Sequence, residues 1–224
     1  MKSGIIKLLL VFGTLFLASC DRGEANSDLE AALPYYQFRD SERANLVIAP
    51  KVDDQIVYKN QDGDVITFKV KGSELGKTAY STGNLSSSSS IKHFFYDRQE
   101  ISMWYVDNDL RAKSTINISK YPLGSNYNVD PPITGTPTFS GWIDFPLWNG
   151  GSYLYLDFNS VLYPMTFGGK TYSKVMVFKS NKTVVIGAEN QLPIRPRNVN
   201  IVYYDYNYGI IGFDDLNGKL WRLQ

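Results

Sequence analysis

The chain has 224 residues with 23 Lys and Arg, 22 Asp and Glu, one His and one Cys, so its formal net charge is +1. A near-neutral chain without basic runs lacks the charge pattern of a nucleic-acid-binding protein, and one Cys with one His excludes an internal disulfide and a His-rich metal site. We expect no cofactor and no metal. The 16 Tyr and 12 Phe residues favour β-strands and aromatic binding surfaces.

The first twenty residues have the pattern of a bacterial secretion signal. Lys2 and Lys7 give a positive start, and residues 5–18 are otherwise almost entirely apolar or small. This stretch is shorter than the about 20 apolar residues that a membrane-spanning helix needs. It therefore predicts a signal peptide at residues 1–19.

The segment Leu17-Ala18-Ser19-Cys20 resembles the lipobox of bacterial lipoproteins. The resemblance implies that Cys20 becomes the first residue and carries diacylglycerol, often with a further chain such as palmitate on its amine. Two or three chains hold a protein stably on a membrane. The alternative is an ordinary secretion signal with a chance cysteine near the cleavage site.

The location that the lipobox resemblance implies is the cell envelope. There the protein would be an outer-membrane lipoprotein that faces the periplasm or the cell surface. Asp21 directly follows the cysteine and leaves the inner membrane open.

Residues 20–50 are expected to form the anchor, a tether and a lead-in. Residues 21–28 (DRGEANSD) are polar and small, which is typical of a flexible tether. Residues 27–33 and 40–46 have the pattern of short helical turns, with an irregular lead-in as the alternative. We expect residues 51–224 to form a single β domain.

Alternation of apolar and polar residues begins after Val52. Ile66, Phe68 and Val70 alternate with polar neighbours, and residues 55–60 are the expected partner strand across Asp62-Gly63, a strong hairpin signal. A calcium loop over residues 60–64 is the competing interpretation. Its first ligand position falls on Tyr58, which has no carboxylate, so we favour the turn.

The middle of the chain combines strands with two long irregular segments. Residues 91–97 and 100–107 predict aromatic-rich strands, and residues 110–119 alternate so regularly that they predict a strand with one solvated face. Residues 76–90, which end in five serines, predict a surface loop or a ragged strand start. Residues 121–138 are rich in Pro and Gly and predict a long loop; a domain boundary there is the alternative to the single domain that we favour.

The second half is a series of short strands separated by turns. The pattern predicts an all-β fold of roughly ten to twelve antiparallel strands, as a sandwich or an open or half barrel. The expected strands are 138–147, 152–158, 161–167, 171–179, 183–188, 198–206, 209–214 and 219–223. Residues 171–179 and 183–188 are expected to pair across a turn at residues 180–182.

Two C-terminal segments, residues 169–175 (GKTYSKV) and residues 203–221, which contain YGIIGF and NGKLW, resemble a pattern found in uncharacterised β-rich lipoproteins of Bacteroidetes-type bacteria. The resemblance covers about fifty residues. It implies consecutive strands at the C-terminus of an antiparallel sheet, and it implies no catalytic residues.

Candidate catalytic residues are few. His93 shares a predicted strand face with Ile91 and Phe95, which is more typical of a packed residue than of a base, and the chain has no Gly-x-Ser-x-Gly elbow. Asp144, Asp157 and Asp205 lie on predicted strands among aromatic residues. Two of them facing one cleft would suit a glycosidase, whereas solvated surface acids are the simpler interpretation.

Trp142, Trp148, Tyr153 and Tyr155 surround a predicted turn at residues 149–151. Loops at a sheet end often present binding groups, so we expect part of this group to be exposed and to bind a glycan or a protein partner. Tyr153 and Tyr155 should face outward, because the opposite strand face is the better core face; it carries Leu154, Leu156 and Phe158. The alternative is that the four aromatic residues belong to the core or to a strand edge.

Together, these patterns predict a lipid-anchored envelope protein that recognises a protein partner or a glycan through an aromatic surface, and they favour a binding protein over an enzyme. Two alternatives stay open. One is a carrier of an apolar ligand, because alternation alone does not distinguish a cavity from a filled barrel. The other is a hydrolase that uses strand carboxylates.

Overall fold

The computed structural model describes residues 33–82, 92–106, 112–122, 137–151, 153–184 and 197–224. The predicted signal peptide, Cys20, the tether, the serine run and most of the proline-rich loop lie outside these residues, and what was predicted for them stays a prediction. In the described ranges, no helix has the length and apolar character needed to cross a bilayer.

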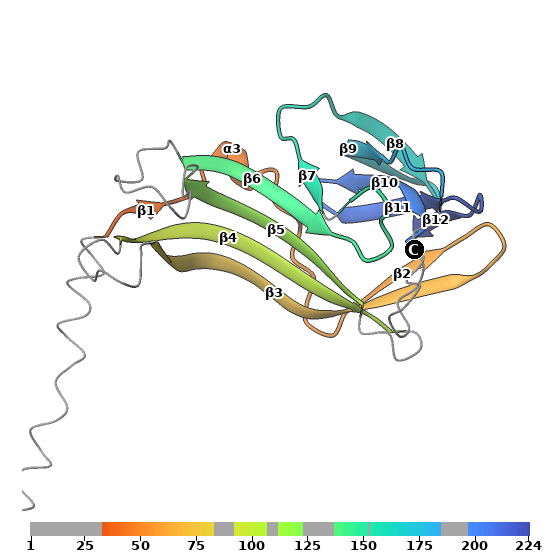
Figure 1. Ribbon diagram of the computed structural model, residues 1–224, viewed down its shortest axis with the longest axis horizontal. Coiled ribbons are helices and arrows are strands. Elements are labelled where there is room, and N and C mark those ends of the chain that lie inside the picture. The colour runs from red at the N-terminus through yellow and green to blue at the C-terminus, as the bar shows by residue number, and fades with distance from the viewer. Residues whose placement is uncertain (1–32, 83–91, 107–111, 123–136, 152, 185–196) are drawn as a thin grey trace, which may run out of the picture.

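In the described residues, twelve strands form one sheet (Figure 1). Eleven run in the order β7-β6-β5-β4-β3-β2-β12-β11-β10-β9-β8 with antiparallel neighbours, and β1 pairs in parallel with β4. The predicted all-β fold is confirmed, and the sheet is an open half-barrel. Its strands are β1 (Tyr35–Tyr36), β2 (Gln55–Lys59), β3 (Val65–Thr82), β4 (Lys92–Tyr105), β5 (Lys113–Pro122), β6 (Pro137–Asp144), β7 (Leu154–Leu156), β8 (Tyr163–Phe167), β9 (Lys170–Lys179), β10 (Val199–Asp205), β11 (Gly209–Asp215) and β12 (Leu220–Leu223), with one short helix, α3 (Asp40–Arg43).

The hairpin predicted at Asp62-Gly63 is present. Strand β2 pairs with β3 from Lys59↔Val65 onward, and Gly63 has a φ of +91°, a conformation that favours glycine. Strand β3 differs from expectation in its length, because the segment that begins at Gly76, expected as a loop, continues the strand to Thr82. Pairing with β4 along the whole of this stretch stabilises a Gly- and Thr-containing strand end that local composition does not favour.

A second difference concerns the partner of β9. Residues 171–179 were expected to pair with residues 183–188, but β9 pairs with β8 and β10. Thr183 and Val184 are not in a strand, and residues 185–188 lie outside the described part. Strand β8 pairs with the first part of β9, from Lys170 to Val175, and β10 pairs with its last part, from Val175 to Lys179.

Aromatic rings fill the interior of the half-barrel. Phe145, from the segment after β6, contacts Phe68 of β3 and Phe213 of β11, with ring centroids 6.1 and 5.2 Å apart. Tyr58 of β2 joins the group at 5.1 Å from Phe213, and its hydroxyl donates to the Ile210 carbonyl at 2.8 Å. The main core therefore lies in the curve of the sheet, between strands that are not neighbours.

The segment that follows β6 packs against the start of β10, in the other half of the sheet. Trp148 forms a parallel bridge with Val199, and this bridge carries two hydrogen bonds of 3.0 Å: the Asn149 N–H donates to the Val199 carbonyl, and the Val199 N–H donates to the Leu147 carbonyl. Farther along, Phe158 stacks on Tyr206 at 5.1 Å. These contacts hold the segments that flank β7 against β10, in the other half of the sheet.

The lead-in, residues 35–50, crosses the concave face and packs into the main core through Phe38 and Val47. Buried polar groups of β4 hold it there. The Asp97 carboxylate accepts hydrogen bonds from the Phe38 N–H (2.8 Å) and from Arg43 (3.0 Å). The Gln99 amide binds both the N–H (3.0 Å) and the carbonyl (2.7 Å) of Val47, as a neighbouring strand would.

The same lead-in also contacts the other strands around the curve. Glu42 forms an ion pair with Lys120 of β5, and the Lys174 ammonium of β9 donates to the Ala44 carbonyl at 2.9 Å. The Ile48 N–H donates to the Asn207 carbonyl, in the turn between β10 and β11, at 2.8 Å. The lead-in thus links both halves of the sheet across its open side.

On the convex face of the sheet, Arg222 of β12 contacts side chains of β8, β10 and β11. Its guanidinium bonds Asp214 at 2.7 Å and lies over the rings of Phe167 (4.6 Å) and Tyr203 (5.0 Å). A Cβ on Gly212 would lie 2.7 Å from the Trp221 carbonyl oxygen and 3.1 Å from Arg222 Cδ, so this position needs glycine. Burial and the hydrogen bond to Asp214 raise the pKa of Tyr203 to about 12.

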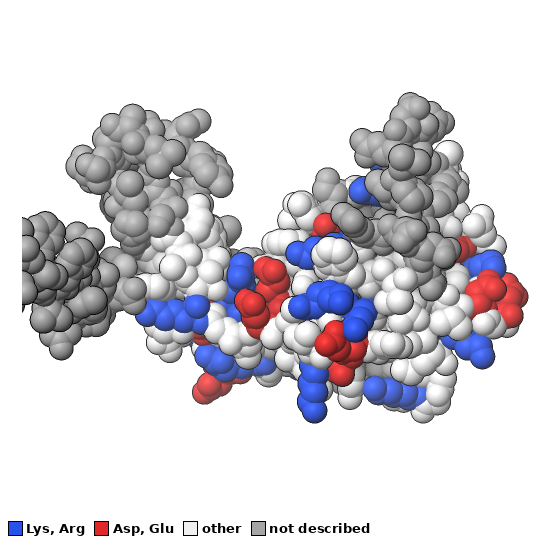
Figure 2. Space-filling model, turned by 90° about the horizontal axis from the view of Figure 1, so that it is seen from below, with Lys and Arg blue, Asp and Glu red and all other residues white. Residues whose placement is uncertain are grey.

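The charged side chains on the face seen in Figure 2 are mixed in sign. Lys and Arg lie beside Asp and Glu along the sheet, and the described residues form no continuous basic surface on this face. Several pairs are within ion-pair distance, among them Lys69 with Asp53 (2.8 Å) and Arg98 with Glu100 (3.3 Å). Such exposed pairs contribute little to stability.

The docking of the lead-in gives a first prediction. Replacing Gln99, which is 1% exposed, by Leu should leave the Val47 N–H and carbonyl buried without partners, at about 1–3 kcal/mol for each group. We expect a lower urea midpoint and faster hydrogen exchange at the Val47 amide.

Gln61→Leu is the matched control. Gln61 also binds a backbone N–H and a carbonyl, those of Leu220 and Gly218, but on the exposed surface where water can replace it. If both substitutions had the same small effect, Gln99 would not be what holds the lead-in in place.

Candidate functional site

Three of the four predicted aromatic residues form one cluster on the convex face. Trp142 of β6 is the cross-strand partner of Tyr155 in β7. The Trp142 and Tyr153 ring centroids are 4.9 Å apart, and those of Tyr153 and Tyr155 are 6.3 Å apart. We call Trp142, Tyr153 and Tyr155 the aromatic surface.

The orientation of the aromatic surface results from strand alternation. Tyr155 is 70% exposed and Tyr153 is 44% exposed, whereas Leu154 and Leu156 are buried in the main core. The prediction that the two tyrosines face outward is therefore confirmed. Trp142 is half-buried against its neighbours.

Trp148 lies elsewhere. It is 6% exposed and belongs to the main core, so the alternative of a core position applies to Trp148, and its inclusion in the predicted binding surface is wrong. The reason is the bridge to Val199, which draws the segment beneath β10. A Cβ on Gly150 would lie 2.2 Å from the Trp148 ring, so the turn itself packs on the indole.

A row of polar side chains continues the aromatic surface across the sheet. Cross-strand partners point to the same face, and the register aligns Glu100 of β4 with Asn117 of β5, Asn117 with Trp142, and Trp142 with Tyr155. The Asn117 amide donates to Glu100 at 3.3 Å. Glu100 and Asn117 were not predicted as site residues, because only the register shows that they lie beside the aromatic rings.

The three candidate carboxylates have different environments. Asp144 lies two residues from Trp142 on the same strand face, and burial raises its pKa, while Arg197 and Lys113 act in the opposite direction. Asp157 accepts the Asn159 N–H at 3.0 Å, and Asp205 accepts the N–H groups of Lys174 and Asn207. Asp157 and Asp205 therefore stabilise turns. The side chain of His93 lies outside the described part.

Among the pockets lined by described residues, two that open into the half-barrel are candidate ligand sites. The lead-in pocket, of about 240 Å³, lies between the lead-in and the sheet. Its wall is mostly aliphatic and includes Val47, Ile56, Ile101, Met103, Ile116 and Ile210. Among the residues that the structure describes, no charged side chain lines it.

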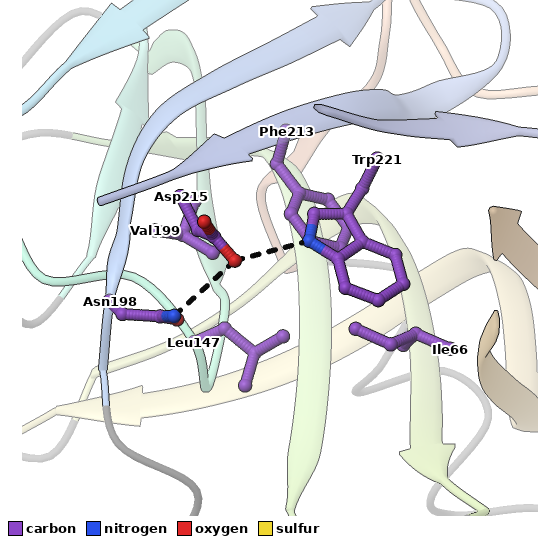
Figure 3. A pocket seen from close by; sticks show the side chains of 7 residues that line it. All are labelled: Ile66, Leu147, Asn198, Val199, Phe213, Asp215 and Trp221. Atoms are coloured by element: carbon purple, nitrogen blue, oxygen red, sulfur yellow. Dashed lines mark hydrogen bonds between the residues drawn. The ribbon is translucent and has the colours of Figure 1, made fainter. Parts of the chain in front are cut away.

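The Asp215 pocket, of about 290 Å³, is assembled from four strands and the segment after β6 (Figure 3). One carboxylate and one amide face a wall that is otherwise aliphatic and aromatic. The lining residues are Ile66, Leu147, Asn198, Val199, Phe213, Asp215 and Trp221.

The described ranges contain no cluster of three or more His, Cys, Asp or Glu side chains placed to bind a metal ion.

Comparisons of the chain with protein-family models, with curated proteins and with solved structures gave no match. The case for a function therefore depends on the geometry of the aromatic surface and the two pockets.

The different positions of the two tryptophans give the second prediction. Trp148→Ala should lower the free energy of unfolding by the about 3–5 kcal/mol typical of a buried aromatic residue. Trp142→Ala should cost clearly less, because its ring is half-buried on the outer face. Urea unfolding followed by circular dichroism measures both, and equal losses would contradict the placement of Trp148 in the core.

Proposed function

We propose that this protein is a lipid-anchored cell-envelope protein that binds a glycan through the aromatic surface. The observation that carries the proposal is the continuity of aromatic rings with amide and carboxylate groups, from Tyr155 through Trp142 and Asn117 to Glu100. The Tyr155 ring is exposed, Trp142 and Glu100 are half-buried, and Asn117 is 7% exposed. The anchor is the lipid on Cys20 that the lipobox resemblance implies.

The chemistry of a sugar matches this arrangement. A pyranose ring has apolar C–H faces that stack on aromatic rings, while its hydroxyl groups need hydrogen-bond partners at the edge. Tyr153 and Tyr155 supply ring faces, and Asn117 and Glu100 supply donors and acceptors beside them. Buried polar groups that match a ligand's hydroxyls provide specificity as well as affinity.

The ring orientations favour one type of glycan. The planes of Trp142 and Tyr153 differ by 57°, and those of Tyr153 and Tyr155 differ by 72°. Such tilted rings do not form the flat platform that a crystalline polysaccharide surface requires. They suit a single, twisted glycan chain whose successive sugars meet different rings.

The third prediction concerns Tyr155. Its truncation to Ala should weaken glycan binding by at least about 2 kcal/mol, or about 30-fold, as for other aromatic anchors. Stability should change by no more than about 0.5 kcal/mol, because the side chain is exposed. Affinity electrophoresis in gels that contain soluble polysaccharides, with peptidoglycan pull-down alongside, measures the binding.

Tyr163→Ala provides the control, because Tyr163 is an exposed tyrosine on β8, the opposite edge strand. It should leave binding unchanged. Retention of full binding by Tyr155→Ala would contradict the proposed surface. Failure of the parent protein to bind any glycan, combined with Tyr155-dependent capture of an envelope protein, would assign the surface to a protein partner.

A second candidate function is supported by the lead-in pocket. A cavity of about 150 Å³ accepts benzene, and drug-sized ligands occupy about 300 Å³ or more. The 240 Å³ of this pocket lie between these values. Its wall is mostly aliphatic and, among the described residues, has no charged side chain, which suits a short acyl chain or a similar apolar molecule of the kind that a carrier would hold.

The fourth prediction tests the carrier function. Ile56→Trp should fill the lead-in pocket and lower the affinity for the apolar fluorophore N-phenyl-1-naphthylamine at least tenfold. Val57→Trp is the matched control, because Val57 is the next residue of β2 and does not line the pocket. Equal fluorescence titrations for the parent and both variants would contradict the carrier function.

A further inference from the structure

We propose that the Asp215 pocket binds a small organic ammonium ion, a primary amine with a short apolar body. The site is separate from the aromatic surface, and it shares no residue with the lead-in pocket. Three features carry the inference: the unequal hydrogen bonding of the two carboxylate oxygens, the lack of an ion pair between Asp215 and any described Lys or Arg, and the aromatic and aliphatic wall.

The two oxygens of Asp215 have different partners. Oδ1 accepts the backbone N–H groups of Asn217 (2.9 Å) and Lys219 (3.1 Å), which fixes the turn between β11 and β12. Oδ2 accepts only side-chain donors, Asn198 at 3.4 Å and the Trp221 indole at 3.3 Å (Figure 3). Both distances exceed the usual 2.7–3.2 Å for N–H···O bonds, so Oδ2 keeps capacity for a stronger donor.

The charge of Asp215 is not paired within the described part of the chain. The residue is 8% exposed, and no ion pair connects it to a Lys or Arg there. Lys219, four residues away, places its ammonium on Asp62 and Asp64; it is near enough to attract Asp215 but forms no ion pair with it. Hydrogen bonds offset part of the cost of burying the Asp215 carboxylate, and a bound ammonium group would add a cation in direct contact and a short hydrogen bond.

The rest of the wall accommodates the body of such an amine. Trp221 is stacked on Phe213, with ring centroids 5.8 Å apart and planes 21° apart, and an aromatic face attracts a cation. Leu147 and Ile66 supply aliphatic surface opposite the indole (Figure 3). The volume of 290 Å³ limits the ligand to a small molecule.

Other ligand classes fit less well. An anion would be repelled by Asp215, the one charged side chain that lines the pocket in the described part of the chain. A calcium ion needs six to eight oxygen ligands, which one carboxylate and one amide do not provide. A neutral molecule would leave the buried charge as it is.

Titration of the full chain with benzylammonium, followed by calorimetry and by Trp fluorescence, tests the proposal. We expect saturable binding that is at least tenfold tighter than that of benzyl alcohol, which has the same shape without the charge. Asp215→Asn keeps a carbonyl oxygen for the two backbone donors of the turn and removes the charge. It should weaken benzylammonium binding at least tenfold and leave benzyl alcohol unaffected.

Asn198→Lys is the second variant. A lysine ammonium at this position can reach Oδ2 and occupy the site from within the chain, so the variant should fold and lose benzylammonium binding even if Asp215→Asn fails to fold. Asp62→Asn is the control, because Asp62 is an exposed acid that does not line the pocket, and it should bind like the parent.

Two results would overturn the proposal. One is the absence of saturable benzylammonium binding to the parent protein. The other is undiminished benzylammonium binding by Asn198→Lys, or by a folded Asp215→Asn variant, which would leave Asp215 as a turn anchor alone.

Discussion

The structure depends on the hydrogen bonds by which β4 holds the lead-in across the concave face. A strongly curved sheet exposes its inner face unless another segment covers it, and a covering segment that is largely irregular, as the lead-in is, brings backbone groups that need partners. Asp97 and Gln99 supply these partners from inside the sheet. Because the same lead-in also contacts β5, β9 and the turn after β10, it fixes how far the half-barrel opens.

The two pockets and the outer face result from this arrangement. The aromatic core of Tyr58, Phe68, Phe145 and Phe213 fills the middle of the curve. Space remains where the covering segments meet the sheet, and each pocket is lined by one of them, the lead-in in one case and the segment after β6 in the other. Interiors are normally packed without such spaces, which makes these two places the natural sites for small ligands.

The outer face has a different role, because the β6–β7 edge presents tyrosines where a solvated strand usually carries charged or small polar residues. Short edge strands limit unwanted pairing with other chains, and β7 has only three residues. An edge strand this short can present aromatic side chains while leaving few unpaired backbone groups with which another chain could form a β-sheet. The proposed glycan surface therefore lies on an edge where the Tyr155 side chain is exposed to a ligand and contributes little to the core.

The sequence by itself determined the local features: the all-β class, the Asp62-Gly63 hairpin, the outward direction of Tyr153 and Tyr155, and the lipobox-like segment. Each depends on residues close together in the chain, such as the alternation of Leu154, Tyr155 and Leu156. Only the tertiary structure placed Trp148 in the core, paired β9 with β10, aligned Glu100 and Asn117 with the aromatic surface, and joined Asn198, Asp215 and Trp221 in one pocket. These arrangements depend on register and on contacts between distant segments, and the curvature of the sheet, which sets them, is not encoded in any single stretch of residues.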